Sequence, residues 1–131
     1  MYKTIRAVAV LVCFLGTSQG VMADDWQVMN KDEIVSTFSG KTAWGEHAQK
    51  DKRGMNYYNP DGTWIGKRLD NTGSNSGKWY VDEENRLCQT HEDGDTRCRI
   101  IKKKGDKIRK YKGEKYVWKY TKFEDGDHVS K

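Results

Sequence analysis

The sequence has few of the residues that build metal clusters, redox pairs and catalytic sites. Its 131 residues include three cysteines, three histidines and one proline. No C-x-x-C redox pair is present. The stretch GSNSG at 73–77 differs from a nucleophile elbow because Asn75 stands at its centre, and the following Lys78 lacks the flanking residues of a P-loop. We therefore expect no enzymatic activity, no catalytic residues and no cofactor.

Only one long apolar run occurs, at residues 7–16, between the basic stretch MYKTIR and the small-residue site VMA at 21–23. This order is typical of a secretory signal peptide. A membrane anchor is disfavoured because spanning a bilayer takes roughly 20 apolar residues, about twice the length of this run. We expect residues 1–23 to be the signal peptide, with cleavage after Ala23 and a periplasmic or secreted location.

The chain that remains, residues 24–131, has a size typical of one domain. Its net charge falls from +5 to +3, because cleavage removes two of the 24 basic residues and none of the 19 acidic ones. A chain of this size buries only about two-thirds of its unfolded surface, so a covalent crosslink would help it. No later run is long enough to span a membrane, and we expect a monomer.

The stretch NKDEIVSTFSG at 30–40 predicts a short helix that packs as a plug, with Asn30 and Glu33 as a capping box and Gly40 as its stop. After it, short aromatic and β-branched stretches alternate with turn signals. We predict strands at residues 42–47, 54–59, 63–69, 77–81, 86–91, 96–103, 107–112 and 115–123. This favours an all-β fold, a small antiparallel up-and-down barrel or curled sheet of about eight strands. Such a barrel would be lipocalin-like; a two-sheet sandwich is the alternative.

Cys88 and Cys98 both follow the expected cleavage site, and an exported protein favours their pairing. If their strands turn through Glu92–Gly94, His91 faces Asp95 and Cys88 faces Cys98 in a non-hydrogen-bonded pair. Side chains approach each other most closely at such a pair, within disulfide reach. Zinc held by Cys88, His91 and Cys98 is disfavoured, because no fourth ligand lies nearby in the sequence. The sequence predicts a disulfide and no metal.

Aromatic side chains are dense in the predicted strands. They either fill the core of the barrel or line a cavity for an apolar ligand, a glycan or a partner. The candidates for ligand binding are Tyr58, Trp64, Trp79, Trp118 and Tyr120.

Basic residues are concentrated near the C-terminus, where residues 99–122 hold eleven lysines and arginines against two acidic residues. Such a stretch is either a solvated outer face or a surface that concentrates anions. The candidates for anion binding are Lys102, Lys103, Lys104, Lys107, Arg109 and Lys110.

The order YYNPDGTW (57–64), GKWYVDEENRLC (77–88) and then Cys98 resembles a family of small exported proteobacterial proteins that is catalogued as a domain of unknown function. The family has a signal peptide, a helix ending in a glycine-threonine turn, a "pdGtw" turn, a "GxW" strand and two cysteines. The resemblance spans nearly all of the expected mature chain, and it implies a fold rather than an activity.

We therefore expect a non-enzymatic binding module of the bacterial envelope that engages an anionic or amphipathic envelope component or a protein partner. Nucleic acid is not expected as a partner in that compartment. The alternative is an inhibitor of a secreted hydrolase, either a protease or a lysozyme, that presents a loop such as Asp70–Ser76. That alternative rests on a likeness of architecture to small disulfide-bearing periplasmic inhibitors.

Overall fold

The computed structural model describes residues 25–131, so the expected signal peptide and its cleavage site lie outside the described residues. The elements in chain order are β1 (Gln27–Val28), α2 (Lys31–Phe38), β2 (Lys41–His47), β3 (Arg53–Tyr58), β4 (Thr63–Arg68), β5 (Ser74–Val81), β6 (Arg86–Thr90), β7 (Thr96–Lys104), β8 (Lys107–Lys112) and β9 (Lys115–Asp125).

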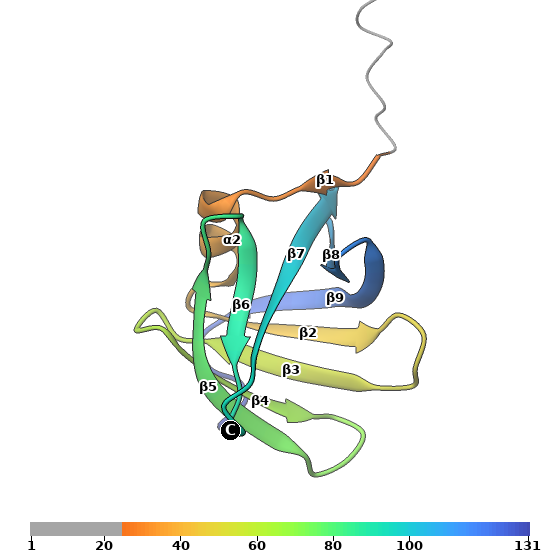
Figure 1. Cartoon of the computed structure of the whole chain (residues 1–131). Coiled ribbons are helices and arrows are strands. Elements are labelled where there is room, and N and C mark those ends of the chain that lie inside the picture. Colours follow the sequence, from red (N-terminus) through yellow and green to blue (C-terminus); the bar gives the residue numbers. More distant parts are fainter. Residues whose placement is uncertain (1–24) are drawn as a thin grey trace, which may run out of the picture.

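Strands β2 to β9 form one closed antiparallel barrel (Figure 1). The order around it is β7-β6-β5-β4-β3-β2-β9-β8, and β8 pairs with β7 to close the ring. Each pair of barrel strands that are consecutive in the sequence forms an antiparallel hairpin. The remaining pairing joins β2 with β9, the first and last strands of the barrel. The predicted barrel of eight strands is confirmed, and the sandwich alternative is wrong.

Two departures from the predicted strands arise from pairing partners that lie far away in the sequence. The short strand β1 was not predicted; it extends the sheet where Gln27 and Val28 pair with Lys103 and Lys102 of β7. Strand β5 begins at Ser74, three residues earlier than expected, because its polar first residues pair with the end of β4.

Helix α2 covers one end of the barrel (Figure 1). The predicted capping box is present: the Glu33 amide donates to the Asn30 side chain at 2.9 Å, and the Asn30 amide donates to the Glu33 carboxylate at 3.0 Å. Ile34 and Phe38 are fully buried, whereas Val35 is exposed. Phe38 packs edge-on against three rings of the barrel, those of Tyr58, Tyr120 and Phe123. The helix is therefore the plug that the sequence predicted.

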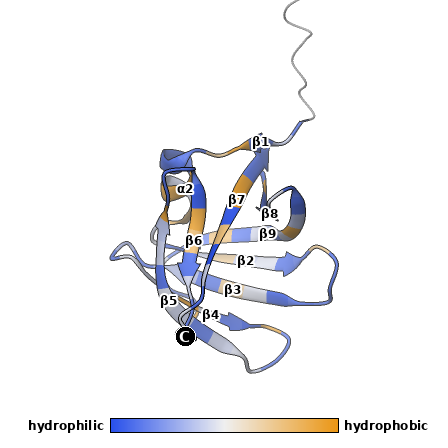
Figure 2. Cartoon of the chain, viewed as in Figure 1, coloured by the Kyte–Doolittle hydropathy of each residue, from blue (hydrophilic) through white to orange (hydrophobic). Residues whose placement is uncertain are grey.

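The interior of the barrel changes character along its axis. Near α2 it is filled by a hydrophobic core that includes Tyr58, Trp79, Val81, Leu87, Ile101 and Tyr120. In Figure 2 the most hydrophobic residues of β6 and β7 lie in the half of each strand nearer α2, between the hydrophilic residues that begin β6 and end β7 and the hydrophilic half toward the turn that joins the strands. Of the residues in phase with the core, Leu87 and Ile101 lie nearer α2, and Gln89 and Arg97 lie nearer that turn. The end of the barrel away from α2 is therefore the polar end.

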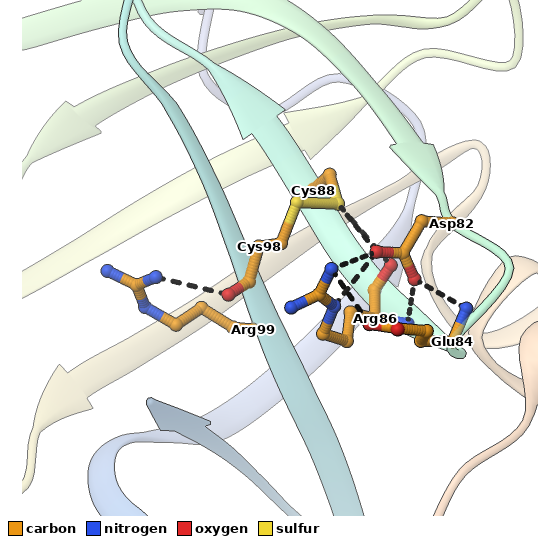
Figure 3. The surroundings of a disulfide bond; sticks show 6 residues. All are labelled: Asp82, Glu84, Arg86, Cys88, Cys98 and Arg99. Atoms are coloured by element: carbon orange, nitrogen blue, oxygen red, sulfur yellow. Dashed lines mark hydrogen bonds and ion pairs between the residues drawn. A yellow bond between two sulfur atoms is a disulfide. The ribbon is translucent and has the colours of Figure 1, made fainter. Parts of the chain in front are cut away.

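The predicted hairpin register is confirmed, and Cys88 is joined to Cys98 by a disulfide. Gly94 has φ +89°, and the His91 amide donates to the Asp95 carbonyl at 2.8 Å to close the turn. Cys88 and Cys98 are directly opposite, with their Cα atoms 4.0 Å apart. Figure 3 shows the disulfide beside the Asp82 carboxylate, which is held in turn by Arg86.

Removal of the disulfide tests how much of the stability it supplies. Crosslinking residues separated by 10 positions restricts the unfolded chain and is worth about 2–3 kcal/mol in the chain-entropy model. We expect the Cys88→Ala/Cys98→Ala variant to lose that amount of unfolding free energy, measured by urea denaturation of the oxidised protein and the variant. A reductant should lower the midpoint of the wild type and leave the variant unchanged. Equal unfolding free energies for the two proteins would contradict this role.

Candidate functional site

The polar end of the barrel contains a cavity with a volume of about 410 Å³, which we call the mouth cavity. Seven strands or their ends contribute to it. Its lining residues are Gly54, Asn56, Trp64, Gly66, Lys67, Arg68, Gly73, Ser74, Asn75, Gln89, His91, Arg97, Lys110 and Trp118. Four of these are lysine or arginine, and within the described chain none of the lining residues is aspartate or glutamate.

The alternation of side chains along β7 and β8 places two of the cations in the cavity. Ile101 is fully buried in the core and pairs with Lys110 on β8, so Lys110 also points inward. Arg97 is in phase with Ile101 on β7 and faces Gln89 of β6. Because β8 next pairs with β9, Lys110 also lies directly opposite Trp118.

Positive charge is crowded at this wall. Burial, and after it the nearby guanidinium groups of Arg99 and Arg97, together lower the pKa of the Lys110 amine to about 8. Burial, followed by the charge of Arg97, also holds the pKa of His91 below its usual value. At neutral pH Lys110 therefore carries its charge at a cost, and His91 is neutral.

The part of the cavity wall that β3, β4 and β9 form contains two indole rings and several glycines. An added Cβ at Gly45 would lie 2.1 Å from the Trp118 Nε1 atom, and one at Gly54 would lie 3.7 Å from the same indole. The Trp118 ring thus lies over positions where only glycine leaves room. A Cβ at Gly66 would likewise approach the Trp64 ring to 2.9 Å. Trp64 is fixed by a hydrogen bond from its Nε1 to the Thr90 carbonyl oxygen at 2.8 Å.

A layer of neutral polar groups separates the cavity from the hydrophobic core. The Asn56 amide donates to the Tyr58 hydroxyl at 3.5 Å, and that hydroxyl donates to the Gln89 side-chain oxygen at 3.4 Å. Burial raises the pKa of Tyr58 to about 12, so its hydroxyl is protonated at physiological pH. Toward the rim, His91 Nδ1 and Arg68 Nε are buried without a hydrogen-bond partner among the described residues. The described lining of the cavity therefore carries positive charge and no negative charge.

The predicted aromatic ligand-binding residues separate into two groups. Trp64 and Trp118 line the mouth cavity, and Trp64 also belongs to the hydrophobic core, against which Trp118 packs. Tyr58, Trp79 and Tyr120 belong to the core and are not among the lining residues. For those three residues, the reading of the aromatics as core fits better than the reading as ligand contacts.

Four of the six predicted anion-binding residues face one another across β7 and β8, where Lys102 pairs with Arg109 and Lys104 pairs with Lys107. Lys103 and Lys110 alternate with them along the two strands. Of the six residues only Lys110 reaches the mouth cavity. Lys103 forms an ion pair with Glu33 of the helix, and Lys102 lies 4.5 Å from the centre of the Tyr111 ring. Arg109 lies 4.2 Å from the ring centres of Trp26 and Tyr116. Lys104 and Lys107 flank the β7–β8 turn at the α2 end.

Sequence reasoning missed most of the polar lining. The missed residues are Asn56, Lys67, Arg68, Asn75, Gln89, His91 and Arg97. A signal was present for most of them, because polar residues stand two positions from inward apolar residues, as in Asn56-x-Tyr58 and Leu87-x-Gln89-x-His91.

The alternative zinc set of Cys88, His91 and Cys98 does not come together. His91 lines the interior of the barrel, whereas Cys88 lies an odd number of residues away on the outer face of β6. Asp82, Cys88 and Cys98 lie close together among the described residues, but both sulfur atoms are engaged in the disulfide.

Comparisons of this chain with protein-family models, with curated proteins and with solved structures find no match. Within residues 25–131, no helix has the length and apolar character needed to cross a membrane.

The charge of Lys110 predicts a distinctive pH dependence of stability. Its pKa is about 8 in the folded protein and about 10.4 in an unfolded chain, so the folded state loses the proton first as pH rises. The unfolding free energy therefore rises as the pH increases from the folded-state pKa to the unfolded-state pKa. Below both pKa values the buried charge of Lys110 destabilises the fold. We expect Lys110→Met to raise the unfolding midpoint at pH 7, by an amount that shrinks toward pH 10.

The matched control is Lys107→Met, which removes an exposed charge from the same strand. Thermal unfolding followed by circular dichroism at both pH values would measure the effect. A midpoint difference between wild type and Lys110→Met that does not change with pH would contradict the assignment.

Proposed function

We propose that the protein is an exported, non-enzymatic binding module of the bacterial envelope that takes an anionic ligand into the mouth of its barrel. One observation carries the proposal: four lysines or arginines line the mouth cavity and none of its described lining residues is a carboxylate. Two of the four, Arg68 and Arg97, pair with carboxylates outside the lining, and Lys110 is not among the cations that form ion pairs in the described chain. Lipocalin-like barrels of eight strands can hold one small ligand in this way. A volume of about 410 Å³ lies in the range of small-molecule sites.

The electrostatics favour an anion over a neutral ligand. Lys110 is crowded by Arg97 and Arg99, which depresses the pKa of its amine. A bound anion would offset that repulsion in a partly desolvated site, where charge-assisted hydrogen bonds are stronger than neutral ones.

Binding rather than catalysis is supported by the chemistry of the lining. The cavity supplies cations, amides and indole rings. Hydrolases that act through a side-chain nucleophile need that nucleophile hydrogen-bonded to a base. The histidine in the lining instead lies edge-on against Trp64, with ring centres 5.2 Å apart, and its Nε2 faces the Arg97 guanidinium at 3.5 Å.

The hydrolase inhibitor is the second candidate, supported by the loop between β4 and β5. Residues 69–73 are exposed, and their base is braced by the Arg68–Asp70 ion pair at 2.7 Å and by the Arg68 amide donating to Gly73 at 2.8 Å. An exposed but braced loop suits insertion into an active site. Such binding would tolerate salt, whereas anion capture by lysine and arginine would weaken as ionic strength rises.

Inorganic phosphate tests the anion site directly. We expect millimolar phosphate to raise the unfolding midpoint above that in chloride of matched ionic strength, because a ligand that binds only the folded state stabilises it. Lys110→Met should remove this gain, and Lys107→Met should keep it. Loss of the gain in both variants, or in neither, would place the anion somewhere other than the mouth cavity.

Export predicts a defined mature mass. Protein taken from the periplasm should have the mass of residues 24–131 minus two hydrogens, because the leader is removed and the disulfide forms. Native mass spectrometry, before and after reduction, would measure both features. A full-length mass would contradict cleavage after Ala23, and a mass unchanged by reduction would contradict the disulfide. A mass heavier by one zinc would reopen the metal alternative.

A further inference from the structure

The mouth cavity has two unlike walls that meet at one pair of residues. Lys110 and Trp118 are direct cross-strand partners on β8 and β9, and both line the cavity. Inward side chains at such a pair lie about 5 Å apart. If the anionic group of a ligand binds Lys110, the rest of that ligand would therefore lie next to the Trp118 indole.

The Trp118 ring is placed to receive a flat group. It lies over Gly45 and Gly54, where an added Cβ would overlap it or touch it, so the indole rests against the wall of the barrel. Trp118 is only partly buried, unlike Trp64, which is 3% exposed. Part of the Trp118 side chain therefore remains accessible from the cavity, and aromatic side chains pack well against flat apolar groups.

Gly54 and Gly66 lie between the two indoles. Gly66 pairs with Asn56 across β3 and β4, and Gly54 pairs with Arg68 in the same ladder. The Asn56 side chain covers Gly66, because an added Cβ there would lie 1.9 Å from its Oδ1 atom, so the accessible flat surface is the Trp118 ring. The cations Lys110 and Arg97 come from the β7–β8 side of the cavity, and Arg97 also pairs with a carboxylate of the adjacent turn at 2.9 Å.

We propose that the ligand is a small planar organic anion, whose anionic group binds Lys110, with Arg97 beside it, while its flat apolar part lies against Trp118. This inference rests on the proposed anion-binding function and narrows it to one class of ligand. The volume of about 410 Å³ lies in the range of sites for one small molecule. Carboxylates, sulfonates and phosphate esters of flat ring systems share the required chemistry.

Two fluorescent probes separate the contributions of charge and of flat apolar surface. 1-Anilinonaphthalene-8-sulfonate and N-phenyl-1-naphthylamine share the same ring system, and the first alone carries a sulfonate. We expect the sulfonate probe to bind saturably at one per chain and at least about tenfold more tightly than the neutral probe, a difference of about 1.4 kcal/mol. Binding would be followed by probe fluorescence and by energy transfer from tryptophan, at pH 7 and constant ionic strength.

Variants assign that preference to residues. Lys110→Met should reduce the preference for the sulfonate probe to less than about threefold, and Lys107→Met should leave it unchanged. Should Lys110→Met fail to fold, Arg97→Gln changes an exposed rim cation of the same cavity and should weaken the preference in the same direction. Trp118→Leu should weaken both probes alike and keep the preference, because it removes the flat surface and retains the charge.

Competition with inorganic phosphate distinguishes the two levels of the proposal. If phosphate and the sulfonate probe both require Lys110 but bind with equal affinity, the anion site stands and the planar ligand is wrong. If neither anion depends on Lys110, the proposed function fails as well. Equal affinity of the wild type for the two probes would also overturn the planar anion, because charge would then contribute nothing.

Discussion

The pairing of β2 with β9 is the contact on which the rest of this structure depends. The other seven contacts of the barrel join strands that are neighbours in sequence, whereas this one joins the first and last strands of the ring. Its register shifts between Trp44 and Gly45, so one residue of β9 is left over. A bulge of this kind bends a strand and re-aims its side chains. Here it lies beside Gly45, over which the Trp118 ring is seated. Closure of the sheet and the shape of the mouth cavity are therefore set at the same place.

The two ends of the barrel differ in how they are filled. Helix α2 fills one end with Ile34 and Phe38. The other end holds Lys110 and unpartnered nitrogen atoms at His91 and Arg68, which lower stability in the absence of a ligand. Sites that are costly to stability are common where a protein binds its ligand. The disulfide braces the β6–β7 hairpin that supplies His91 and Arg97 to this end. The arrangement places a covalent support next to the region that hydrophobic packing stabilises least.

Much of the fold was predictable because local rules and long-range pairing agree. The eight barrel strands follow from alternation and turn residues, and the turn at Glu92–Gly94 together with the spacing of Cys88 and Cys98 selects one register. Strand β1 was not predictable, because two exposed residues form a strand only where β7 offers them a free edge. No local pattern in Gln27 and Val28 indicates that pairing.

The site was less predictable for a different reason. The density of basic residues between 99 and 122 suggested one surface, but strand alternation distributes these residues between two faces. Lys110 points inward while Arg109 points outward against Trp26 and Tyr116. The inward direction of Lys110 could have been predicted from Ile101, the apolar residue that it faces on β7. The sequence does not indicate which inward-facing residues pack in the core and which line the cavity, because that depends on their depth along the barrel axis.

The same alternation is the reason for preferring the mouth over the outer hairpin as the binding site. Several outer cations already have partners: Lys102 has the Tyr111 ring, Arg109 has two rings, and Lys122 has the Trp44 ring at 4.2 Å. These contacts are partly hydrated and contribute modestly to stability. Lys110 also lies near a ring, 5.7 Å from the centre of Tyr120, but it is crowded by guanidinium groups, and no carboxylate is among the described residues that line its cavity. A cation that neighbouring groups already stabilise gains little further stabilisation from a bound anion. A buried cation without such a partner gains the most. The position of the unbalanced charge, rather than the total number of basic residues, therefore identifies where an anionic ligand would bind most favourably.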